Sequence, residues 1–105
     1  MTNNHINKSF IKTQSFQSKV DDLLKSSLIG KEISIIDDNK TMLFGKVFLD
    51  TKNTFLIMTD NNPKHLKKVI KFRKQAILID GLVLPLKLFL GTLSERISKV
   101  YYIHI

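Results

Sequence analysis

Apolar and polar residues alternate through residues 28–58, and this pattern constrains the fold more than any other feature of the sequence. A period of two is typical of strands with one buried face. Two short polar breaks, residues 37–40 and 50–53, carry the Asp and Asn residues that favour tight turns. Connections this short are too short for a parallel crossover, so we predict three consecutive antiparallel strands. Their expected buried positions are Ile33, Ile35, Leu43, Val47, Leu49, Phe55 and Ile57.

The net charge of the chain indicates the class of partner that it binds. The chain has 105 residues, a size that suits one domain, with a formal net charge of +8. Such an excess predicts attraction to a polyanion, and nucleic acid is the leading candidate. The sequence has no cysteine, so neither disulfides nor thiolate zinc sites are available. It also lacks a secretory apolar block and a membrane-length apolar run, and we therefore expect a cytoplasmic protein that does not contact membrane.

The two ends of the chain differ from its middle. Residues 1–14 are polar with few apolar anchors, and we expect a flexible basic and polar arm before a single domain over residues 15–105. Apolar residues then recur at helical spacing from Phe16, with Ser15 as a cap and Asp21 and Asp22 on the solvent face. Thr92 and Glu95 have capping-box spacing and predict a short C-terminal helix.

The most basic segment covers residues 64–74. If this segment is a strand, Ile70 and Phe72 are buried while Lys71 and Arg73 point outward. The outward lysines would then contact phosphate, or would protect an edge strand against aggregation, and both roles can hold together.

Further strands follow this segment. Asp80 and Gly81 lie between two apolar runs and predict a hairpin turn, and Pro85 places the second arm at an edge, in a bulge or at its end. Six strands in series with helices only at the ends predict a mainly β, small antiparallel barrel of six to seven strands. Gly45 suits the bend that closure requires.

Four segments in register resemble one family. They are Leu28-Ile29-Gly30-Lys31, Leu43-Phe44-Gly45-Lys46-Val47, residues 50–57, and Leu88-Phe89-Leu90-Gly91 followed by Glu95-Arg96-Ile97. Together they resemble archaeal ribonuclease P protein component 1, an Sm-like barrel subunit, over residues 26–99. The family usually has Arg-Pro where this chain has Thr92-Leu93, and an aromatic pair where this chain has aliphatic residues near Ile77.

The resemblance implies a function. The chain would be a subunit of an endoribonuclease that removes the 5′ leader from precursor tRNA, and it would bind and stabilise the catalytic RNA. The RNA subunit would hold the magnesium ions, and this chain would bind no cofactor. A small zinc-ribbon protein would be its protein partner. The residues expected to contact that partner are Phe16, Val20, Leu23, Leu24, Phe44 and Phe48.

No residue pattern predicts catalysis or metal binding by this chain. His5, His65 and His104 have no acidic partner at metal-ligand spacing, and no phosphate-binding glycine loop or nucleophile motif occurs. We therefore expect no small-molecule substrate. The residues expected to contact RNA phosphates are Lys31, Lys46, Lys52, Lys67, Lys68, Lys71, Arg73 and Arg96.

Two alternatives remain at this point. Another Sm-like or translation-type barrel that binds a different RNA would have the same charge and strands. A protein-interaction barrel whose lysines only keep it in solution would have the strands without the RNA affinity.

Overall fold

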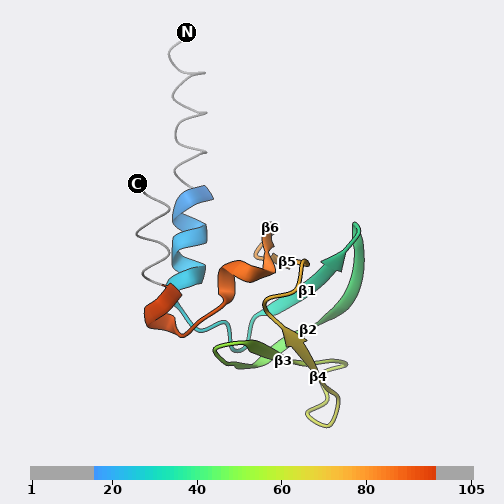
Figure 1. The fold of residues 1–105 in the computed structure, drawn as a ribbon. Helices are drawn as coiled ribbons and strands as arrows, with labels where there is room; N and C mark the ends of the chain where they lie inside the picture. Colours follow the sequence, from blue (N-terminus) through green and yellow to red (C-terminus); the bar gives the residue numbers. More distant parts are fainter. Residues whose placement is uncertain (1–15, 97–105) are drawn as a thin grey trace, which may run out of the picture.

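The computed structural model describes residues 16–96, which form one antiparallel sheet with helices packed against it (Figure 1). The strands are β1 (Glu32–Asp37), β2 (Lys40–Asp50), β3 (Thr54–Met58), β4 (Leu66–Ile70), β5 (Ala76–Ile79) and β6 (Leu82–Pro85). A helix over residues 16–25 precedes the sheet, and a 3-10 helix η1 (Leu86–Phe89) and a helix at residues 93–96 follow it. The predicted arm, the Ser15 cap, His5 and His104 lie outside the described residues.

The sheet is open within the described residues. Its strand order is β4-β3-β2-β1-β5-β6, and every neighbouring pair is antiparallel. The prediction of a mainly β protein with six antiparallel strands and helices at both ends is confirmed. Its edges are β4 and β6, which do not pair with each other, so closure into a barrel is not seen.

The helices cover one face of this sheet, and the core lies between them (Figure 1). Val20, Leu23 and Leu24 from the first helix pack with the inward residues of the strands, and Leu86 and Phe89 join them from η1. The apolar residues that recur every 3.6 positions in the helix and every second position in the strands therefore pack into one cluster. The prediction that Asp21 lies on the solvent face of the helix is wrong. This residue is buried, and its carboxylate accepts a hydrogen bond from the Gln17 side chain.

The predicted hairpin is confirmed. Ile79 pairs with Leu82, and the two turn residues have positive φ values, 49° at Asp80 and 78° at Gly81. That conformation is the one a two-residue type I′ turn requires. The second arm, β6, is an edge strand that ends at Pro85, as the missing N–H of proline predicts.

A bulge in β2 overturns part of the predicted buried pattern. The pairing of β2 with β3 shifts by one residue between Val47 and Leu49, so Leu49 lies opposite Leu56 and Asp50 lies opposite Phe55. Because successive strand side chains point to opposite faces, this shift exchanges the faces of the residues after it. Leu49 is 41% exposed, whereas the Asp50 side chain turns into the protein.

The predicted alternation at the end of β4 is also wrong. Lys71 is fully buried, while Phe72 is 58% exposed. The strand ends at Ile70, and the Lys71 N–H still donates to the Asn53 carbonyl, which continues the β3 pairing for one residue. Val69 and Lys71 therefore share the inward face. A buried ammonium at that position is possible only because a carboxylate meets it there, as described below.

Gly45 lies where β3 approaches β2 closely. A Cβ at this position would come within 2.5 Å of the Met58 carbonyl oxygen and 2.7 Å of the Ile57 side chain. The Met58 backbone cannot move aside for a new Cβ as the end of a flexible side chain could. Close approach of the neighbouring strand therefore explains this glycine.

We expect Gly45→Ala to lower the free energy of unfolding by about 1–3 kcal/mol, the cost of overpacking a close contact. Urea unfolding followed by circular dichroism measures it. Thr41→Ala, at an exposed position of the same strand, is the control and should change stability by no more than about 0.5 kcal/mol. Equal stability of both variants would contradict this explanation.

Candidate nucleic-acid interface and buried ion-pair cluster

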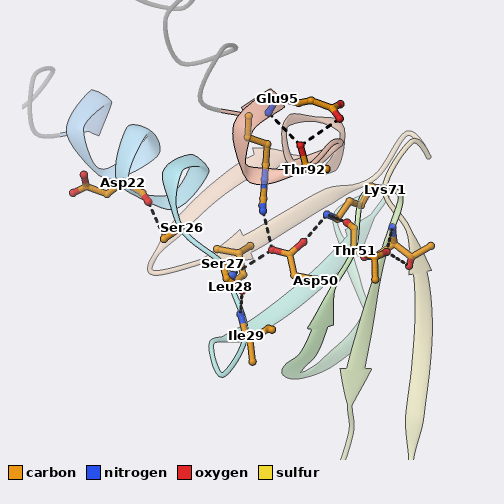
Figure 2. A network of polar contacts seen from close by, with 12 residues as sticks. Asp22, Ser26, Ser27, Leu28, Ile29, Asp50, Thr51, Lys71, Thr92 and Glu95 are labelled. Atoms are coloured by element: carbon orange, nitrogen blue, oxygen red, sulfur yellow. Dashed lines mark hydrogen bonds and ion pairs between the residues drawn. The ribbon is translucent and has the colours of Figure 1, made fainter.

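Asp50 is the centre of a buried polar cluster (Figure 2). Its Oδ1 accepts from the Lys71 ammonium at 2.6 Å, and its Oδ2 accepts from Arg96 Nη2 at 3.1 Å and from the Leu28 backbone N–H at 3.3 Å. The exposed fractions of the three charged side chains lie between 0 and 2%. One carboxylate therefore joins segments that are distant in the sequence.

Local structure places each member of this cluster. The β2 bulge turns Asp50 inward, and continued pairing beyond β4 turns Lys71 toward it. The Lys71 ammonium also donates to the Thr51 carbonyl and lies 4.4 Å from the centre of the Phe55 ring. Such cation–π contacts favour a desolvated cation.

Thr92 helps to position Arg96, the third charged residue of the cluster. Its hydroxyl accepts from the Glu95 N–H at 3.4 Å, and its carbonyl accepts from the Arg96 N–H at 3.0 Å. This arrangement confirms the predicted helix start at Thr92. The first turn then directs Arg96 into the protein, toward Asp50.

Two of the eight predicted phosphate contacts are therefore not at the surface. Lys71 and Arg96 were expected to point outward, but both are buried and bound to Asp50. The sequence offered no sign of this role, because a strand pattern does not reveal a bulge. Asp50 itself was interpreted only as a turn residue.

The remaining predicted contacts fall into two groups. Lys31 forms an ion pair with Asp80 at 2.8 Å, and Lys52 approaches Glu95 at 3.8 Å, so an acidic group offsets the charge of each. Lys46 is half-buried in β2 opposite Glu32. These three side chains are dispersed over the sheet and its turns.

The second group, Lys67, Lys68 and Arg73, lies in a basic segment that also carries Lys64 and Lys74, which were not among the predicted contacts. Five exposed cations occur at or next to the edge strand β4, and none of them has an ion-pair partner among residues 16–96. They are Lys64, Lys67, Lys68, Arg73 and Lys74, called the basic edge below. Asp60 lies 3.7 Å from His65, and Asp37 and Asp38 line a pocket together with Lys74 without an ion pair to it.

The residues predicted to contact a protein partner also divide. Val20, Leu23 and Leu24 belong to the core, so the prediction that they meet a partner is wrong. Phe16, Phe44 and Phe48 are exposed. Phe44 is 60% exposed on β2 and projects from the face opposite the helices, next to exposed Met42. An exposed apolar group of this kind is typical of a contact surface.

Comparison with protein-family models and with curated proteins finds no match for this chain. Residues 16–96 contain no cluster of three or more His, Asp or Glu side chains suited to a metal ion. Within the same range, no helix is long and apolar enough to span a bilayer.

We expect Asp50→Asn to lower the free energy of unfolding by about 3–5 kcal/mol, because it leaves two buried cations without a carboxylate. Asp38→Asn is the matched control. Asp38 is exposed with a φ of 50°, which asparagine tolerates, so stability should change by no more than about 0.5 kcal/mol. Chemical denaturation measures both variants.

Lys71→Met should cost less than Asp50→Asn, below about 2 kcal/mol, because a neutral Asp50–Arg96 pair remains and methionine fills similar space. The same denaturation experiment tests this order. A Lys71→Met variant that is less stable than Asp50→Asn would contradict the stabilising role given to the carboxylate.

Proposed function

We propose that this protein binds RNA through the basic edge, as a non-catalytic subunit of a ribonuclease P. The observation that carries the RNA-binding proposal is that five exposed cations, gathered on one strand edge and its flanks, have no ion-pair partner among residues 16–96. Uncompensated lysine and arginine side chains attract phosphate and release counterions when RNA binds.

The geometry of β4 suits the phosphate backbone. Lys67 lies opposite Ile57 and Lys68 lies opposite Leu56, so the two ammonium groups extend from opposite faces of the strand. Arg73 and Lys74 follow in the turn after the strand. Cations on both faces of an edge can contact successive phosphates of one RNA strand. These contacts would position the RNA without reading its bases.

The assignment to ribonuclease P rests on the family resemblance of the four sequence segments. In this proposal the catalytic RNA holds the magnesium ions and cleaves the 5′ leader of precursor tRNA in the cytoplasm. The curved sheet would act as an Sm-like RNA-binding module. Exposed Phe16, Phe44 and Phe48 would contact the zinc-ribbon subunit, in place of the full set predicted from the sequence.

Two other functions would use the same sheet. A different RNA could occupy the basic edge, in which case RNA binding would persist without any effect on tRNA maturation. The lysines of β4 could instead serve only to prevent edge-to-edge aggregation. Phe44 and Met42 would then make a protein-interaction module the better description.

We expect the triple variant Lys67→Gln, Lys68→Gln, Arg73→Gln to weaken RNA binding and to reduce the slope of log K against log salt by about 2, since each single-strand phosphate contact contributes about 0.7. Lys19→Gln, Lys25→Gln, Lys87→Gln is the matched control, because it removes the same charge from exposed positions elsewhere. Fluorescence anisotropy at several salt concentrations measures both. Equal slopes for the two variants would exclude the basic edge as the interface.

The ribonuclease P assignment is tested by reconstitution. We expect an archaeal ribonuclease P assembled from its RNA and the other protein subunits to cleave precursor tRNA faster when this chain is added. The triple variant of the basic edge should restore less activity than its control. RNA binding without any gain in cleavage would favour the alternative of a different RNA.

A further inference from the structure

A cavity of about 340 Å³ adjoins the buried cluster. It lies between the segment after the first helix, the turn from β2 to β3, and the start of the C-terminal helix (Figure 2). Its polar lining consists of four hydroxyl side chains and two cations besides Asp50, namely Ser27, Thr51, Thr92, Ser94, Lys52 and Arg96. The Thr51 and Thr92 hydroxyls donate to Thr54 and Glu95, whereas the Ser27 hydroxyl only accepts, from the Ile29 N–H. Ser27, Lys52 and Arg96 are therefore the donors that an oxyanion could bind.

The cluster leaves part of the Arg96 guanidinium without a hydrogen-bond partner. Lys71 and Arg96 are both buried, and they share the single carboxylate of Asp50. Arg96 uses Nη2 for that ion pair, while its Nε and Nη1 are buried without a hydrogen-bond partner in the described structure. A guanidinium that lacks partners for two of its nitrogens carries a desolvation cost that a second anion would relieve.

We propose that this cavity binds a phosphate group, with Arg96, Lys52 and the Ser27 hydroxyl as donors. The inference rests on the proposed RNA-binding function, and the phosphate it assigns is a phosphodiester of the bound RNA. Lys52 can turn to the phosphate because its contact with Glu95 is long, 3.8 Å, and both side chains are at least half exposed. The Arg96 nitrogens lie beneath the cavity surface, so a small shift of its wall accompanies binding.

The positive charge of the neighbouring basic edge favours a phosphate of RNA over a carboxylate of a protein as the ligand of this cavity. A phosphodiester and a carboxylate each have two anionic oxygens, so the preference for phosphate comes from the surrounding cations. Lys71 of the same cluster also belongs to the segment that carries the basic edge. One RNA could therefore place a phosphate in the cavity and further phosphates along β4.

Inorganic phosphate is the first probe. We expect it to raise the melting temperature of the full chain in a saturable manner, relative to chloride at equal ionic strength, because it binds only the folded state. Ser94→Asp places a carboxylate at the cavity and should abolish the phosphate response. Ser18→Asp is the control, since it adds the same charge on the exposed face of the first helix and should keep the response.

RNA is the second probe, and it separates a free anion from a phosphodiester. Ser94→Asp should weaken RNA binding by about tenfold or more, whereas Ser18→Asp should weaken it about twofold or less. No phosphate response in the wild-type protein would overturn the inference, even if RNA binding persists and the proposed function stands. A response to acetate but not to phosphate would overturn it in favour of a protein carboxylate. A phosphate response with equal RNA affinities for both variants would overturn the RNA assignment.

Discussion

The buried carboxylate of Asp50 holds the two ends of the described fold together. It accepts from Leu28 in the segment between the first helix and β1, from the residue after β4 and from the last helix. A carboxylate removed from water is stable only when such donors surround it, and the two cations are in turn stable only beside it. Packing of the terminal helices against the sheet therefore depends on one polar interaction as well as on the apolar core.

This arrangement separates structural cations from cations that remain available to a ligand. Lys71 and Arg96 form buried ion pairs with Asp50, and Lys31 and Lys52 lie beside acidic side chains at the surface. The basic edge has no such partners among residues 16–96. Net charge alone predicts a polyanionic partner, but only this division predicts where the partner would bind. The strongest RNA contacts should accordingly come from β4 and its flanks.

Exposed aromatic residues add a second surface to the same sheet. Phe44 lies on the face away from the helices, while the basic edge lies at one side of the sheet. A small subunit with both features could bind RNA along its edge and a protein across its outer face. Within a ribonucleoprotein, each interaction would exclude water from part of a sheet that is otherwise open on that side.

Local residue patterns sufficed for several parts of this fold. The period of two located β1, β2 and β3, Asp80 and Gly81 defined the hairpin, and Thr92 defined the start of the last helix, because each depends on residues close in the sequence. The tertiary structure decided which charges are buried. A one-residue bulge between Val47 and Leu49 turned Asp50 inward, and pairing beyond β4 brought Lys71 to it. A single-residue shift reverses the face of every later side chain in a strand, and no local pattern in this sequence records that shift.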